Sequence, residues 1–165
     1  MKKKILISFI FYLFSFISIQ AEQNFAYIDI DFLFSNSTKG KEIINSLNTI
    51  NKKNFEEISI NEKKIAILDK EINLKKNILS KNETQNMIDE LNQLILETNK
   101  KKKELLNNFE KKKNDEIQNF FSEIRPIIDN YMKKNSINII FDKKNIFMAN
   151  KNHDITLEIL ELILN

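Results

Sequence analysis

Residues 41–134 read KEIINSLNTINKKNFEEISINEKKIAILDKEINLKKNILS (41–80) and KNETQNMIDELNQLILETNKKKKELLNNFEKKKNDEIQNFFSEIRPIIDNYMKK (81–134). They contain no Gly and a single Pro, and they are rich in Lys, Glu, Asn, Ile and Leu. Their apolar residues recur at steps of three and four, which is the spacing of one face of an α-helix. The stretch therefore predicts long amphipathic helices.

Each half carries one apolar stripe that is close to a heptad rhythm. The stripes consist of Leu47, Phe55, Ile58, Ile65, Leu68, Ile72 and Leu79, and of Ile88, Leu91, Ile95, Leu105, Phe109, Phe120, Ile124, Ile127 and Tyr131. Polar residues interrupt these seams at Asn51, Glu62, Lys75, Thr98 and Lys102. Two long helices with imperfect seams are therefore expected.

A helix start is predicted between the two halves. Ser80 is followed three residues later by Glu83, which is the pattern of a capping box. Because the segments on either side are similar in length, we expect a long antiparallel coiled-coil hairpin over residues 41–124, with its tip near residues 79–86. Such an arm reaches roughly 60 Å. One unbroken helix and a compact three-helix bundle are the alternatives, but a bundle needs wider apolar faces than these.

The N-terminus has the layout of a secretory signal peptide. Lys2, Lys3 and Lys4 precede an apolar run over residues 5–19, and Ala21 stands before the polar Glu22. The run is short for a membrane span, which takes about twenty residues. We therefore expect residues 1–21 to be removed by cleavage between Ala21 and Glu22; the alternative is an uncleaved membrane anchor.

Processing changes the charge of the chain. The three N-terminal lysines belong to 26 basic residues, so 23 basic and 23 acidic residues remain. A nucleic-acid binder is expected to keep a basic face, so no nucleic acid is expected as a partner. Lysine runs at 100–103 and 111–113 are typical of a solvated helix face, and they allow at most transient contact with an acidic membrane surface.

The composition argues against an enzyme. The chain has no Cys and one His, His153, so it lacks the usual nucleophile and metal-ligand sets. It contains no glycine-rich phosphate loop. We expect no catalytic residue, no metal and no cofactor.

The remaining segments predict a small body of α+β type, in a chain that is mainly α. Residues 24–30 read as a buried strand, residues 31–34 as a turn, and residues 136–141 and 146–149 as a β-hairpin around a turn at 142–145. A last helix is expected from Thr156 to Leu164, capped by Asp154 or Thr156. Pro126 is expected to kink the second long helix where it rejoins the body.

The predicted body, residues 22–40 and 125–165, is small for independent stability. Its sheet also has open edges, which are prone to associate unless they are covered. Both features favour a symmetric oligomer. Its expected contact residues are Phe25, Tyr27, Ile28, Ile139, Phe141, Ile146 and Phe147.

The chain resembles the Skp/OmpH family of periplasmic chaperones over nearly all of its predicted mature length. Residues 25–29 followed by Phe34, Ser37 and Gly40 are similar to the family's first strand and helix start, and residues 125–127 to its proline in the returning helix. The most specific similarity is in the C-terminal segment: residues 139–143, then Asn145, Ala149 and 154–156. Its motif residues here are Asp142, Asp154, Ile155 and Thr156.

The resemblance implies a periplasmic homotrimer in which three helical arms hang from a β-rich body. It further implies an ATP-independent holdase that keeps unfolded outer-membrane β-barrel proteins in the cavity between the arms. Apolar residues that flank the seams are candidate client contacts: Ile60, Ile67, Leu74, Leu94 and Leu96. Packing between the two helices is the other interpretation of these residues. The alternative function is a structural spacer or scaffold of the cell envelope.

Overall fold

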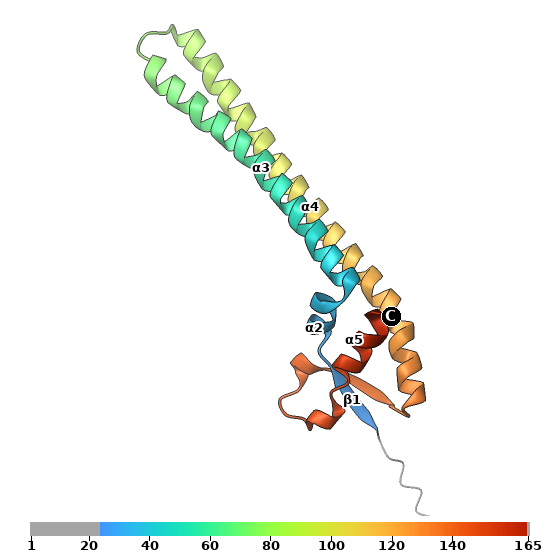
Figure 1. The fold of residues 1–165 in the computed structure, drawn as a ribbon. Coiled ribbons are helices and arrows are strands. Elements are labelled where there is room, and N and C mark those ends of the chain that lie inside the picture. Colours follow the sequence, from blue (N-terminus) through green and yellow to red (C-terminus); the bar gives the residue numbers. More distant parts are fainter. Residues whose placement is uncertain (1–23, 165) are drawn as a thin grey trace, which may run out of the picture.

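The computed structural model describes residues 24–164, which form a long helical arm above a small body (Figure 1). The predicted signal peptide and the cleavage residues Ala21 and Glu22 lie outside the described residues. In chain order the elements are β1 (Phe25–Ile28), α2 (Ile30–Asn36), α3 (Thr38–Lys75), α4 (Lys81–Lys134), β2 (Ile139–Asp142), two 3₁₀ turns, η1 (Lys143–Asn145) and η2 (Lys151–His153), and α5 (Thr156–Leu164). The described chain is mostly helical with a small sheet, as the sequence predicts.

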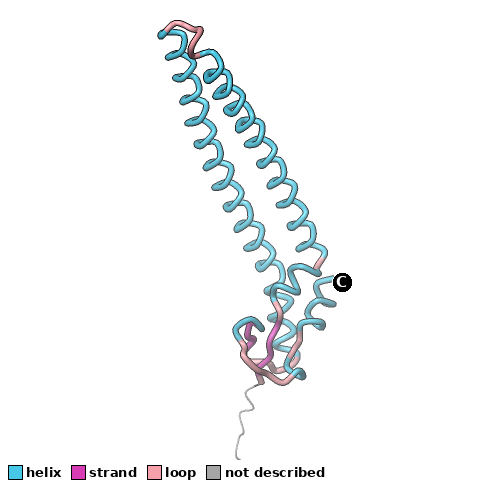
Figure 2. Tube along the Cα trace, turned by 90° about the vertical axis from the view of Figure 1, so that its left-hand side faces the viewer, coloured by secondary structure: helices cyan, strands magenta, loops and turns pink. Residues whose placement is uncertain are grey.

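The arm consists of α3 and α4, which lie side by side along its length (Figures 1 and 2). Lys39 near the start of α3 pairs with Glu123 late in α4, whereas Glu57 pairs with Lys101. The partners' numbers rise on one helix as they fall on the other, so the two helices run in opposite directions. With 38 residues, α3 is about 57 Å long.

The turn at the far end of the arm is short. Residues 76–80 lie between α3 and α4, so the turn begins and ends earlier than the predicted segment 79–86. Ser80 is the N-cap of α4: its hydroxyl accepts from the Glu83 N–H at 3.3 Å, and the Ser80 N–H donates to the Glu83 carboxylate at 2.9 Å. Hydrogen bonds from the Ser80 hydroxyl and N–H lower the pKa of Glu83. This reciprocal capping satisfies free N–H groups at the first turn of α4 and fixes its start immediately after the turn.

The sheet differs from the predicted β-hairpin. Its two strands, β1 and β2, are parallel, with Phe25 opposite Ile139 and Ile28 opposite Asp142. Residues 146–149 form no strand, because the chain leaves β2 through η1, where the Asp142 side chain accepts from the Lys144 N–H at 3.2 Å. The predicted second late strand is therefore wrong. Strand β2 pairs instead with the other end of the chain.

The junction between β1 and the arm contains a helix where a turn was predicted. Asp29 caps α2 by accepting from the Phe32 N–H at 2.9 Å, and Ser37 caps α3 by accepting from the Gly40 N–H at 3.1 Å. Two caps in succession set the angle at which the arm leaves the body. Gly40 is buried in this corner against the Phe34 backbone.

Two adjoining apolar cores hold the body and the base of the arm. The first contains Ala26, Ile28, Leu33, Ile155 and Ile159. The second contains Ile43, Phe120 and Ile124, and the ring of Phe34 meets that of Phe120 edge to face with centroids 5.0 Å apart. Pro126 lies inside α4 just beyond this second core. The apolar core is thus concentrated where the arm joins the body.

Candidate functional site

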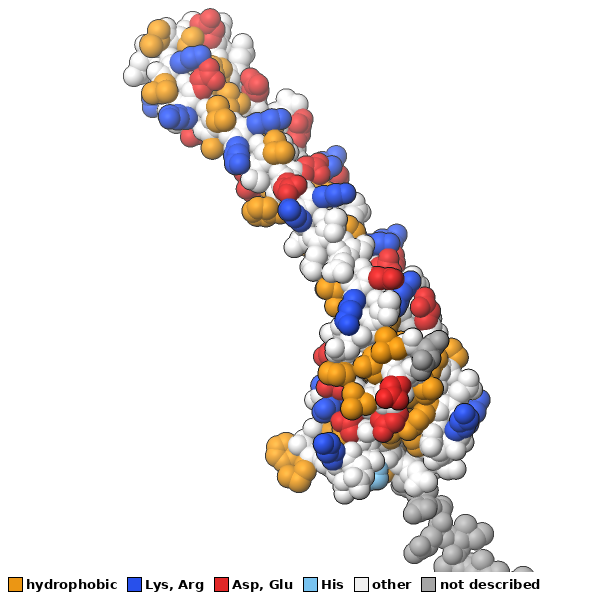
Figure 3. All heavy atoms as spheres, viewed as in Figure 1, with side chains coloured by type: hydrophobic (Ala, Val, Ile, Leu, Met, Phe, Trp, Pro, Cys, Tyr) orange, Lys and Arg blue, Asp and Glu red, His pale blue; other side chains and the backbone are white. Residues whose placement is uncertain are grey.

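Large apolar side chains are exposed along the arm. On α3, Ile60, Ile67 and Leu74 recur every seven residues, about 180–220° around the helix from the seam residue Leu47. Leu96 on α4 is also exposed, whereas Leu94 is half-buried. In Figure 3 apolar side chains are scattered among charged ones on the arm and gather over the body. The candidate contact residues on α3 therefore form a second stripe on the face opposite the seam.

One predicted seam residue is not in the seam. Phe55 is 73% exposed, whereas Leu47, Ile58 and Ile65 are half-buried and Ile72 is buried. Phe55 follows Leu47 by eight residues, which places it about 80° around the helix, whereas Ile58 lies only about 20° from Leu47. The angular position of each residue, rather than the step of three or four, would have identified Phe55 as a surface residue.

The polar interruptions of the seam behave in two different ways. Glu62 and Lys102 approach each other across the two helices at 3.9 Å, next to the closer pair of Glu57 and Lys101 at 3.0 Å. All four side chains are about half exposed. Thr98, in contrast, is buried, and its hydroxyl has no hydrogen-bond partner among the described residues. The middle of the arm is therefore held partly by exposed ion pairs, and it buries one hydroxyl without a partner among the described residues.

Apolar residues are also exposed at one side of the body. Strand β1 is covered on both edges, by β2 and by the segment around Ile155, whose N–H donates to the Tyr27 carbonyl at 3.1 Å. Within the described chain, β2 pairs only with β1, and its Ile139 and Phe141 side chains are about half exposed. An outer edge of this kind can pair with another strand.

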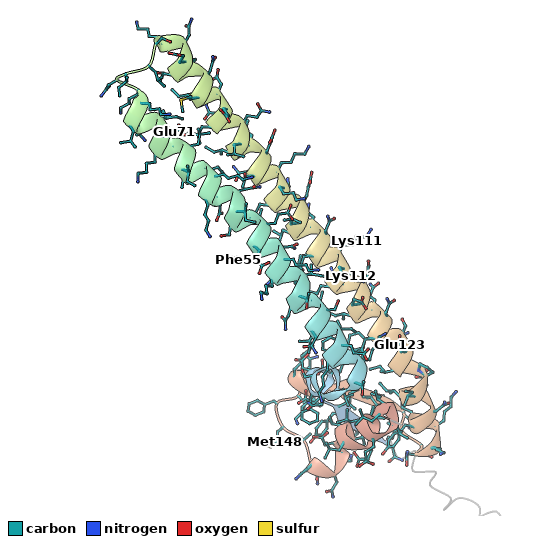
Figure 4. The ribbon with its side chains drawn as sticks, turned by 45° about the horizontal axis from the view of Figure 1, so that its top comes forward. Phe55, Glu71, Lys111, Lys112, Glu123 and Met148 are labelled. Atoms are coloured by element: carbon teal, nitrogen blue, oxygen red, sulfur yellow. The ribbon has the colours of Figure 1, made fainter. Side chains whose placement is uncertain are left out.

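The loop after η1 extends this surface. Phe147 is 99% exposed and Met148 is 82% exposed, and Figure 4 shows Met148 at the side of the body, away from the arm. Ile146 is half-buried. The loop-and-edge surface is defined here as Ile139, Phe141, Phe147 and Met148. The exposure of Met148 was missed, because residues 146–149 were read as a paired strand.

Two of the predicted contact residues are internal to the chain. Tyr27 and Ile28 are buried within the body, so they stabilise it rather than form an exposed surface. Phe25 is partly exposed and stacks on His153, with ring centroids 4.6 Å apart. His153 ends η2, so its ring secures the loop that leads to α5.

The C-terminal motif closes the body through a polar network. The Asp154 carboxylate accepts from the Thr156 N–H at 3.1 Å and from the Thr156 hydroxyl at 2.5 Å, and the same hydroxyl accepts from the Asp29 N–H at 2.9 Å. The Lys143 ammonium lies 3.4 Å from Asp154 and 3.6 Å from Asp29. The motif thus ties the start of α5 to the end of β1.

The network shifts the ionisation of its members. Burial raises the pKa of the Asp154 carboxyl, but the hydrogen bonds from Thr156 and the Lys143 ammonium outweigh it, so the pKa lies below its ordinary value. The hydrogen bond to Asp154 and the charges of Asp154 and Asp29 raise the pKa of Lys143. Both shifts favour the charged pair at neutral pH. These charged hydrogen bonds join the end of β1, the turn η1 and the start of α5.

Two further features that would bear on function are a metal-binding cluster and a membrane-spanning helix. Within residues 24–164 no cluster of three or more His, Asp or Glu side chains is arranged to hold a metal ion. In the same range no helix combines the length and apolar character that crossing a membrane requires.

Comparison with known proteins relates the chain to one family. A solved structure from Caulobacter crescentus CB15, described as an OmpH-like outer membrane chaperone, has the same fold with a TM-score of 0.74. The likeness covers 87% of this chain and 85% of that one at 15% sequence identity, so it concerns the fold alone. No curated protein matches the sequence. A family model described as "Outer membrane protein (OmpH-like)" matches residues 24–163, which confirms the resemblance noted from the sequence: this chain belongs to the OmpH-like outer membrane protein family.

Proposed function

We propose that this chain is an ATP-independent holdase chaperone that binds unfolded outer-membrane β-barrel proteins in the periplasm. Its family supports a chaperone role, and the structural neighbour from C. crescentus is described as an outer membrane chaperone. The observation that carries the proposal is the exposed apolar stripe of Ile60, Ile67 and Leu74 on the outer face of α3. An apolar stripe kept in water without a partner in the chain suits many weak contacts with varied unfolded segments.

The proposal includes export and assembly. Residues 1–21 act as a signal peptide cleaved before Glu22, and the mature chain assembles as a homotrimer. Residues 22–40 and 125–165 form the body, and residues 41–124 form an antiparallel coiled-coil arm. The loop-and-edge surface supports self-association, because it places two highly exposed apolar side chains beside an open strand edge. Three arms around one axis enclose the client, and lysine runs such as residues 100–103 allow transient contact with a membrane surface.

The test is native mass spectrometry of the protein recovered from the periplasm, alone and with an outer-membrane barrel protein diluted from urea. We expect a trimer that takes up one unfolded client without nucleotide, and a parallel loss of client aggregation measured by light scattering. A trimer that ignores the client would replace the holdase proposal with that of an envelope scaffold. A monomer in both samples would contradict the proposed assembly.

A further inference from the structure

A groove lies midway along the arm, between α3 and α4. Its volume is about 220 Å³, and its apolar lining comes from both helices: Phe55, Ile58, Leu105, Leu106 and Phe109. Phe55 and Leu106 are mostly exposed, whereas the other three are half-buried. Figure 4 shows Phe55 projecting from the middle of α3, far from the body. The groove therefore combines a partly covered apolar floor with two large side chains that are open to solvent.

The arm gains little stability from this arrangement. An apolar side chain stabilises a fold by leaving water, and Phe55 does not. A hollow of about 150 Å³ lined by apolar side chains is sufficient to hold a benzene ring. The groove has a larger volume but is open to solvent on one side, so there is space for an aromatic side chain from outside to lie against the residues that line it.

The polar rim indicates the chemistry of the occupant. Asn51 and Asn54 line the groove, and neither side-chain amide makes a hydrogen bond within residues 24–164. Each amide can donate and accept, which matches the N–H and C=O groups of an extended backbone. The charged residues of the rim, Glu62 and Lys102, pair with each other. The groove thus presents free amides and no net charge, a poor complement to a charged ligand.

We propose that this groove binds an uncharged, extended segment of an unfolded polypeptide and seats one aromatic side chain against Phe55 and Leu106. The Asn51 and Asn54 amides hydrogen-bond the backbone of that segment. Strands of outer-membrane barrels alternate apolar and polar residues and carry aromatic residues near their ends, so they supply such segments. The inference rests on the proposed holdase function and assigns it a specific aromatic subsite.

The chain has no Trp, so Phe55→Trp introduces a single tryptophan, whose emission can be excited selectively, into the groove of the full protein. The probe is a capped peptide of alternating Phe and Gln, with a counterpart that has Ala in place of Phe. We expect the Phe peptide to shift the emission to the blue and the Ala peptide to bind about tenfold more weakly. Ile78→Trp, at an equally open position in the turn, is the control and should not respond.

Truncation provides the second measurement. Phe55→Ala combined with Leu106→Ala should weaken Phe-peptide binding about tenfold. The matched control is Ile78→Ala with Leu157→Ala, two exposed positions outside the groove, and it should leave binding unchanged. Circular dichroism should show unaltered helix content in all variants.

The outcomes separate the groove from the holdase function. Equal peptide binding by the groove pair and the control pair would overturn the subsite, even if the unaltered protein still suppresses client aggregation. A blue shift that appears without peptide and grows as the protein concentration rises would also overturn the subsite, because a second copy of the chain would then fill the groove. Peptide binding at the groove without any suppression of client aggregation would support the subsite and contradict the holdase proposal.

Discussion

Gly40 occupies a corner of the fold that has no space for a side chain. A Cβ atom there would lie 1.6 Å from the Phe34 carbonyl oxygen and 2.8 Å from the Ser37 hydroxyl that caps α3. Because the nearest obstacle is backbone, Gly40→Ala should lower the free energy of unfolding by about 1–3 kcal/mol, despite the better helix propensity of Ala. Urea unfolding followed by circular dichroism measures this loss.

The control for Gly40 is Asn48→Ala, at an exposed position on the same helix. It should raise the free energy of unfolding by a few tenths of a kcal/mol, about the propensity difference between Asn and Ala. If Gly40→Ala has the same free energy of unfolding as Asn48→Ala, the prediction is wrong. The corner between α2 and α3 would then open for a side chain without loss of stability.

Asp154 makes the stability of the body depend on pH. Its pKa is lowered in the folded chain, because hydrogen bonds from Thr156 and Lys143 outweigh the effect of burial. A lowered carboxyl pKa contributes stability above the unfolded value of about 4, and this contribution is lost as the pH falls through the folded pKa. Asp154→Asn should therefore cost about 1–2 kcal/mol at neutral pH and progressively less in acid.

The measurement for Asp154 is urea unfolding at neutral pH and at about pH 3. Asp129→Asn, at an exposed carboxyl on α4, is the matched control and should change stability little at either pH. An Asp154→Asn deficit of constant size across this range would mean that the network stabilises the body independently of the carboxylate charge.

At the scale of elements, the two long helices and the Ser80 cap could be predicted from the sequence, because their signals are local. The pairing of β2 with β1 could not, since it joins segments more than a hundred residues apart and no local pattern distinguishes it from a hairpin. Helix α2 was missed for a different reason: its seven residues contain Phe32 and Phe34, which read equally well as a chain leaving a strand. Predicting the groove at Phe55 from the sequence would have required the angular position of each residue around its helix.

The charged pair in the seam should make the arm compliant. Glu62 and Lys102 are exposed and 3.9 Å apart, and such a pair contributes about 0–1 kcal/mol. Glu62→Leu with Lys102→Leu should raise the free energy of unfolding by about 1 kcal/mol through apolar contact. It should also narrow the distribution of distances between spin labels attached at Lys70→Cys and Asn92→Cys. The labelling is specific because the chain has no other Cys.

The control for the seam pair is Lys63→Leu with Lys103→Leu, at exposed positions beside it. These changes should leave the distribution of spin-label distances as broad as in the unaltered arm. Equal narrowing in both pairs would attribute the effect to added hydrophobicity in general. We further expect a compliant arm to fit clients of different sizes. Unchanged capture of large clients by the stiffened arm would contradict this expectation.

At the scale of the whole molecule, the loop-and-edge surface should control assembly. Phe147→Ser with Met148→Ser removes two apolar side chains that contact little within one chain. The variant should therefore keep its fold while its self-association weakens by about tenfold or more. Sedimentation velocity over a dilution series measures this change, and Ile67→Ser with Leu74→Ser, on the arm, should assemble normally. Assembly that survives loss of Phe147 and Met148 would place the contact elsewhere.

The charge balance of residues 22–165 predicts how the proposed clients would be held. Under the proposed cleavage before Glu22, 23 basic and 23 acidic residues remain, so no net attraction is expected to draw in a charged client. Apolar contact should then dominate, so raising NaCl from about 50 to about 500 mM should change client affinity by less than about threefold. Calorimetry should show a negative heat-capacity change on binding, the mark of buried apolar surface. A steep loss of affinity with salt would instead assign capture to the lysine runs at 100–103 and 111–113, and the apolar stripe on α3 would lose its role as the principal contact.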